Sequence, residues 1–247
     1  MKFRIEEGQK PFFYDVLLCL VLYLIAVSLP APFFLDQASF TCMLRLLVLL
    51  PICALLLPHA SPELLKTKKG FFLCLPFLIL CFGNLCSLPF ASSRTPSNSD
   101  LVLQGFFTLI TAGVEEILFR YGVCSFLART NLKRFRIPIS ALLFGLTHLL
   151  GIFGGAAIVP TLAQAGYTCL LGLLLGIVYE FGGFVLAILF HFFFNFLQND
   201  LFLSLGGGEW NIAFFAFNIG FYVICVGYAY FLNFNLLKNR CGKRTNP

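Results

Sequence analysis

The stretch Gly113-Val-Glu-Glu-Ile-Leu-Phe-Arg-Tyr-Gly122 places three charged side chains inside a long apolar run. An ionisable side chain at membrane depth costs about 2.5 kcal/mol or more, unless it is paired, hydrated in a cavity or used in chemistry. On a helix, Glu116 and Arg120 are four residues apart on one face and can form an ion pair, whereas Glu115 points about 100° away from Glu116. Glu115 is therefore expected to be the spare carboxylate.

The composition around this stretch is that of a polytopic membrane protein. Of the 247 residues, 59% are hydrophobic and 11% are charged, whereas about a quarter of the residues are charged in soluble domains. The mean hydropathy is +0.90. Spans of about 20 residues each use up nearly the whole chain. We therefore expect an all-α integral membrane protein with a single transmembrane domain over residues 1–247.

Apolar runs that are long enough to cross a bilayer predict about eight transmembrane helices. Their expected ranges are 13–34, 38–58, 70–91, 101–127, 137–154, 161–181, 183–204 and 211–236. Lysine and arginine side chains gather on alternate flanks of these runs, at residues 2–10, 66–69, 129–136 and 238–244. By the positive-inside rule both chain ends are then cytoplasmic, and we expect the protein in the cell membrane, which is the inner membrane of a two-membrane cell.

The net charge and the cysteines give two further expectations, one about partners and one about packing. The charge of +6 comes from basic residues that border the spans and form no face interleaved with aromatic side chains. We therefore expect contact with anionic membrane lipids and no nucleic-acid partner. The ten cysteines lie mostly in apolar runs without a C-x-x-C pair, so they are expected to pack as small apolar side chains.

Two further polar sites fall inside apolar runs, at His148 and at His191 with Asn195. Counted at about 1.5 Å per residue from the cytoplasmic helix ends, Glu115, His148 and His191 lie roughly 14–21 Å deep. Asn195 is four residues beyond His191, so both side chains share one helix face. Three separate helices thus bring polar side chains to a similar level, where one intramembrane cavity can hold them together.

This set of side chains fits hydrolysis of a peptide bond. A buried carboxylate suits a general base that takes a proton from water, and a nearby histidine can share that work. A His/Asn donor pair can stabilise the oxyanion that forms when water attacks a carbonyl. A second mechanism stays open, because Glu115, His148 and His191 could instead bind catalytic zinc. In the first mechanism no cofactor is required.

Three motifs in this order resemble the CPBP intramembrane proteases, also called the CAAX-protease and bacteriocin-processing or Abi family, which includes the type II CAAX prenyl endopeptidases. The resemblance covers residues 101–200, which we expect to form the catalytic core. The matching motifs are E-E-x-x-x-R at Glu115, Glu116 and Arg120, F-x-x-x-H at Phe144 and His148, and H-x-x-x-N at His191 and Asn195.

The resemblance implies roles for these residues and a class of substrate. Glu115 would activate water with help from His148, and His191 and Asn195 would stabilise the oxyanion. The substrate would be a membrane-associated protein or peptide, with or without a lipid modification. Supporting or substrate-binding roles fall to Glu116 and Arg120, although a buried ion pair that fixes helix packing explains these two residues equally well.

Two other functions and several further residues complete the expectations. Buried carboxylates and histidines also build the proton relays of proton-coupled transporters, and a non-catalytic membrane immunity or interaction protein could retain the same scaffold. Gly172 and Gly176 are expected to let two helices approach closely, and Phe144 is expected to pack against His148. Arg45, inside an apolar run, can snorkel outward or pair with an acid, and has no assigned function.

Overall fold

The computed structural model describes residues 7–29, 37–59, 98–153 and 156–196, together with the isolated positions 5, 220, 223 and 227. The regular elements in this part of the chain are helices, and it contains no strand. The α-helices are α1 (Lys10–Ser28), α2 (Gln37–Leu56), α4 (Asn98–Glu116), α5 (Ser125–Ala128), α6 (Arg136–Thr147), α7 (Ile158–Gly182) and α8 (Phe184–Asn195). A π-helix, η4 (Ile117–Cys124), joins α4 to α5. Short 3₁₀ turns are η1 (Glu7–Gln9), η2 (Leu57–His59), η5 (Lys133–Phe135) and η6 (His148–Ile152).

Several of these helices have the length and apolar character of membrane spans. Four qualify in the described ranges, at Glu7–Ser28, Val102–Ala128, Lys133–Ile152 and Ile158–Gly182. Two shorter apolar helices, Met43–His59 and Phe184–Asn195, fall where spans 38–58 and 183–204 are expected. The expected spans 70–91 and 211–236 lie outside the described residues. The all-helical membrane class is therefore confirmed, whereas the number of eight spans stays a prediction.

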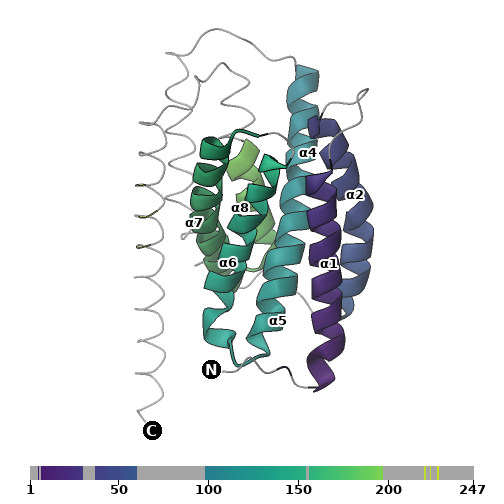
Figure 1. Ribbon diagram of the computed structural model, residues 1–247, viewed down its shortest axis with the longest axis vertical. Coiled ribbons are helices and arrows are strands. Elements are labelled where there is room, and N and C mark those ends of the chain that lie inside the picture. The colour runs from purple at the N-terminus through teal and green to yellow at the C-terminus, as the bar shows by residue number, and fades with distance from the viewer. Residues whose placement is uncertain are drawn as a thin grey trace.

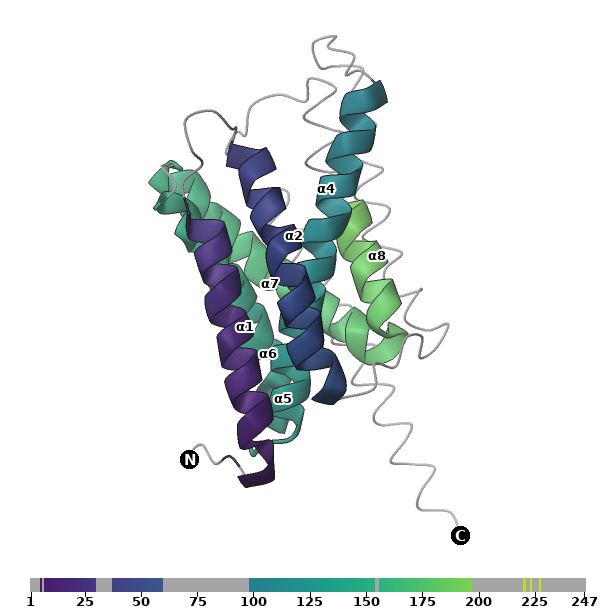
Figure 2. The same ribbon diagram turned by 90° about the vertical axis from the view of Figure 1, so that its right-hand side faces the viewer.

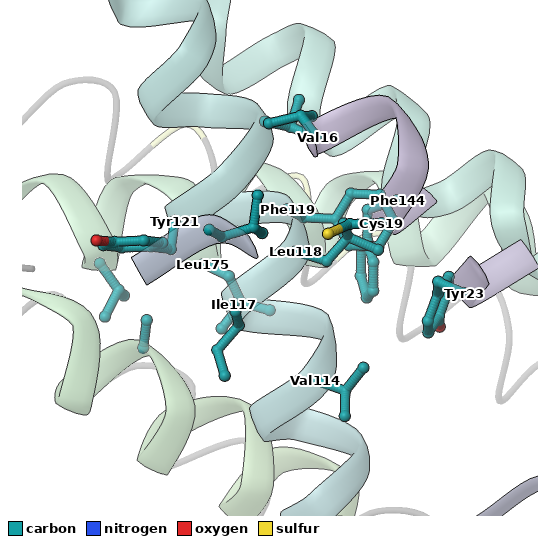
Figure 3. Packing of buried hydrophobic residues seen from close by; sticks show 14 of the residues in the cluster. Val16, Cys19, Tyr23, Val114, Ile117, Leu118, Phe119, Tyr121, Phe144 and Leu175 are labelled. Carbon is teal, nitrogen blue, oxygen red and sulfur yellow. The ribbon is translucent and has the colours of Figure 1, made fainter. Parts of the chain in front are cut away.

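The helix that carries the two adjacent glutamates lies in the middle of the described bundle. α1, α2 and α4 lie together in one part of the bundle, and α6, α7 and α8 lie together in the other (Figures 1 and 2). α4 packs against both α2 and α8, while η4 contacts α1, α2, α6 and α7. Figure 3 shows the apolar packing around η4, with Phe144 and Cys19 on one side of this segment and Tyr121 on the opposite side.

Glycines on α7 allow α6 to pack closely against it, as the sequence predicts. A Cβ atom at Gly172 would lie 2.9 Å from the Cα of Ala141, and one at Gly176 would lie 2.6 Å from a methyl group of Ile137. Distances this short are sterically forbidden, so the two backbones can approach only where both positions lack a side chain. The close contact fixes α6, and with it the helix end that carries His148, against α7.

The reversal from α7 into α8 takes place at a single residue. Gly183 links Gly182 to Phe184 with a φ of 93°, which favours glycine because a Cβ atom is strained in this region. Close by, Arg136 and Glu180 form an ion pair of 2.9 Å between the start of α6 and the end of α7. This tight reversal returns the chain toward α4 and sets the depth at which α8 presents His191.

Candidate active site

The two adjacent glutamates end α4, and the chain continues directly into the π-helix that carries Arg120. Glu116 and Arg120 are both fully buried. Nε of Arg120 lies 3.4 Å from Oε2 of Glu116, so the ion pair predicted from their spacing is present. The guanidinium carbon of Arg120 also lies 4.9 Å from the ring centroid of Phe144. Arg120 is therefore held between a carboxylate of its own helix and an aromatic face of α6.

His191 contacts both glutamates and joins α8 to α4. Its Nδ1 lies 2.9 Å from Oε1 of Glu116, which is hydrogen-bond distance, and its Nε2 lies 3.6 Å from Oε2 of Glu115. His191 and both carboxylates are buried. A carboxylate only accepts hydrogen bonds, so Nδ1 of His191 is the donor to Glu116. The imidazole thus lies between the two carboxylates at the end of α4 and contacts each through a different ring nitrogen.

Glu115 is not the spare carboxylate that helix spacing alone predicts. The hydroxyl of Tyr23 on α1 donates a hydrogen bond of 2.5 Å to its Oε1, and the guanidinium of Arg45 on α2 lies 3.6 Å from the same oxygen. A second Arg45 nitrogen donates to Thr111, at 2.7 Å. Of the two outcomes expected for Arg45, pairing with an acid is the one observed. Spacing along one helix cannot reveal these partners, because they come from α1 and α2.

His148 begins the short 3₁₀ turn η6 at the end of α6 and is half-buried. Its Nδ1 lies 3.1 Å from the carbonyl oxygen of Phe144. Because a carbonyl oxygen only accepts, Nδ1 carries the hydrogen and the neutral ring has a free acceptor at Nε2. The ring of Phe144 packs edge-on against His148 as predicted, with centroids 5.1 Å apart, and also against His191 at 5.7 Å. One phenylalanine therefore supports both histidines.

A polar cavity of about 170 Å³ lies beside this cluster, between the ends of α1, α6 and α7. Its wall combines His148 with Tyr23 and Arg45, the two partners of Glu115. The remaining lining residues are Val27, Thr147, Leu150, Gly151 and Gln164. The cavity thus reaches His148 directly and approaches Glu115 through its hydrogen-bond donor Tyr23 and its ion-pair partner Arg45.

Residues 97–197 match the family model described as Rce1-like, type II CAAX prenyl endopeptidase. Over these residues the chain is similar to that family. No curated protein and no solved structure matches the chain. All three motifs fall inside the Rce1-like region, whereas Tyr23 and Arg45 precede it. The Rce1-like family is a protease family, and with several apolar helices the chain is an integral membrane protein.

Asn195 is the one motif residue that does not join the cluster. It is the last residue of α8 and is half-buried. Within the described residues, it forms no hydrogen bond with Glu115, Glu116, His148 or His191. It shares the helix face of His191, as its spacing predicts, but lies one turn further along. Its role as an oxyanion donor therefore stays a prediction.

The second mechanism open to this site is catalysis by a zinc ion bound to Glu115, His148 and His191. Zinc ligands lie about 2.0–2.3 Å from the metal, so three of them must converge on one point. In the described part of the chain, no group of three histidine, cysteine, aspartate or glutamate side chains is arranged to hold a metal ion. Nδ1 of His148 faces a backbone carbonyl and Nδ1 of His191 faces Glu116, and zinc-bound histidines commonly hold their second ring nitrogen in this way. Zinc binding by Glu115, His148 and His191 therefore stays a prediction.

Proposed function

We propose that the protein is an intramembrane endopeptidase that hydrolyses a peptide bond by means of a water molecule activated by Glu115 and His148. The observation that carries this proposal is the buried cluster in which His191 lies between Glu115 and Glu116. Such a concentration of ionisable groups at membrane depth indicates chemistry. Similarity of its central region to the protease family supports the same reaction class.

The proposed reaction uses the side of Glu115 that Tyr23 does not occupy. A water molecule between Glu115 and Nε2 of His148 gives a proton to the carboxylate while its oxygen bonds to the carbonyl carbon of the substrate. The negative charge that develops on the carbonyl oxygen is stabilised by hydrogen bonds from His191, when its ring is protonated on both nitrogens, and from Asn195. Collapse of this intermediate breaks the C–N bond, and the leaving amine takes the proton back from Glu115.

Glu116 and Arg120 act in this proposal through His191. Glu116 accepts the hydrogen bond from Nδ1 of His191 and is itself held by Arg120. A carboxylate in this position fixes the orientation of an imidazole, as the aspartate does in serine-protease triads. These two residues are thus supporting residues, and neither needs to touch the substrate.

A lipid-modified peptide is the substrate that the shape of the described bundle favours. An apolar cavity of about 280 Å³ lies between α1, α5 and α6 and is lined only by apolar side chains, among them Leu20 and Leu143. One turn further along α1 and α6, Tyr23 and Thr147 line the polar cavity. The apolar part of a lipidated substrate would occupy the first cavity while its peptide reaches the second. The similarity to type II CAAX prenyl endopeptidases supports this class.

The orientation in the cell membrane follows from the basic residues near the apolar cavity. Lys10 begins α1, and Arg129, Lys133 and Arg134 lie between α5 and α6. These ends lie at the same end of the bundle in Figure 1. By the positive-inside rule we place this end, and therefore the N-terminus, on the cytoplasmic side.

The test compares the wild type with Glu115→Gln and His148→Ala after reconstitution in lipid nanodiscs. Cleavage of a farnesylated CAAX peptide is followed by mass spectrometry, together with proteomics of cell membranes for peptides that accumulate uncut. Both variants are expected to lose cleavage while they retain the melting temperature of a folded protein. Glu180→Gln is the matched control, because it neutralises a half-exposed carboxylate in the ion pair with Arg136. Cleavage at the wild-type rate by Glu115→Gln refutes the proposed function.

A further inference from the structure

We propose that Tyr23 and Arg45 are positioning residues for Glu115, so that the catalytic unit includes α1 and α2 as well as the Rce1-like region. This inference rests on the proposed function, in which Glu115 is the general base. Neither residue belongs to the three motifs, and both precede residues 97–197. Their contacts converge on a single oxygen of the proposed base.

Tyr23 is buried to 2% exposure, and its hydroxyl donates to Oε1 of Glu115 at 2.5 Å. The pair joins α1 to α4, and its two residues are 92 positions apart along the chain. A buried phenol requires a hydrogen-bond partner, and an ionised carboxylate is the strongest acceptor among side chains. Packing of the Tyr23 ring against Phe119, with centroids 5.9 Å apart, fixes the direction of this hydroxyl.

Arg45 contacts α4 at two positions that are one helical turn apart. One terminal nitrogen lies 3.6 Å from Oε1 of Glu115, and the other donates to the hydroxyl of Thr111 at 2.7 Å. Thr111 is four residues before Glu115, so the planar guanidinium spans one turn of α4. Two contacts in a rigid plane fix the cation more firmly than a single ion pair would. Arg45 thus holds the Glu115 carboxylate against α2 at a fixed position along α4.

These contacts decide which oxygen of Glu115 is available for catalysis. The terminal torsion of a glutamate is soft, so an unrestrained carboxylate presents either oxygen in many directions. Tyr23 and Arg45 both contact Oε1. Oε2 is thereby directed toward His191, whose Nε2 lies 3.6 Å away. A general base must present one lone pair to its water molecule in a fixed geometry. We therefore assign that task to Oε2 and its alignment to Tyr23 and Arg45.

A packing role and a positioning role make different predictions. If the contacts only hold α1 and α2 against α4, their loss lowers stability and leaves the turnover of the folded fraction unchanged. If they align Glu115, their loss lowers kcat in protein that is fully folded, and KM changes little because the substrate-binding surfaces remain. A displacement of about 1 Å at a reacting group can reduce the rate about 100-fold.

The experiment measures kcat and KM for Tyr23→Phe, Arg45→Met and Arg45→Lys with the farnesylated peptide in nanodiscs. We expect kcat to fall about 10- to 100-fold in Tyr23→Phe and Arg45→Met with KM nearly unchanged, and to recover in part in Arg45→Lys, which keeps the charge. Tyr121→Phe is the matched control, because it also removes the hydroxyl of a buried tyrosine, here one that donates to the carbonyl of Leu57 at 3.2 Å. Its kcat should equal that of the wild type.

A second measurement does not depend on finding a substrate. Melting temperatures are recorded for Tyr23→Phe, for Glu115→Ala and for the double variant, because residues in direct contact give non-additive shifts. The inference predicts that Tyr23→Phe lowers the melting temperature by less when Glu115 is already absent. Additive shifts, or a wild-type kcat in both Tyr23→Phe and Arg45→Met, overturn the inference. Cleavage by Glu115→Gln instead overturns the proposed function, so the two failures are distinguishable.

Discussion

Arg120 offers a quantitative test of how this site is held together. In Arg120→Leu, the fully buried Glu116 loses its ion-pair partner and keeps only His191. Removal of one partner of a buried pair typically costs about 3–5 kcal/mol, because the remaining charge is left uncompensated. The lost contact of the guanidinium with the Phe144 face adds up to about 2 kcal/mol, because both side chains are buried. We therefore expect the free energy of unfolding to fall by at least about 3 kcal/mol.

The assay is reversible unfolding in mixed micelles, with Arg136→Leu as the control. Arg136 also pairs with a glutamate, Glu180, but about a third of each side chain is exposed. Pairs exposed to water contribute about 0–1 kcal/mol, so the control should lose little stability. The double variant Glu116→Leu/Arg120→Leu should recover part of the loss, since it leaves no buried charge from this pair. Equal losses in Arg120→Leu and Arg136→Leu would refute the reasoning.

Three further predictions concern packing, the histidines and metal ions. Gly172→Leu should lower the free energy of unfolding by about 1–3 kcal/mol and reduce activity, because the new side chain separates α6 from α7. Gly166→Ala is the control on the same helix. It should be tolerated in both assays, because no atom lies within 4 Å of the added Cβ. Phe144→Leu should reduce kcat in folded protein, because it removes the ring that supports both His148 and His191. A chelator such as EDTA should leave cleavage unchanged, and loss of activity that zinc restores would contradict the metal-free mechanism.

Much of the fold could be predicted because its signals are local in the sequence. Long apolar runs predict helices wherever the structure describes them, and the four-residue spacing of Glu116 and Arg120 predicts their ion pair. The spacing of Gly172 and Gly176 predicts the close approach of α7 to another helix. These predictions succeed because the interacting groups repeat with the period of a single helix.

The predictions that failed concern contacts between helices. Glu115 was expected to be spare because a helix spacing rule sees only neighbours on the same helix, whereas its partner Tyr23 is 92 positions away. Nothing distinguishes Tyr23 from other tyrosines in apolar runs. Arg45 did carry a signal, since a buried charge needs a partner, but the identity of that partner depends on how α2 packs against α4. Asn195 has the spacing of its motif, and its role as an oxyanion donor stays a prediction.

The π-helix Ile117–Cys124 divides the glutamate helix into two pieces with different windings. π-helical hydrogen bonds join residues five apart, whereas those of the α-helix join residues four apart. A deletion of one residue in this segment could therefore be absorbed by a return to α winding, without turning α4 itself. Glu115 would then stay against Tyr23 and Arg45, while the residues that follow the deletion would turn relative to α4. The proposed base and Arg120 thus stand on differently wound parts of one continuous helix, so a change in chain length here would act on the π-helical side chains, Phe119 and Arg120 among them, and would leave the base in register.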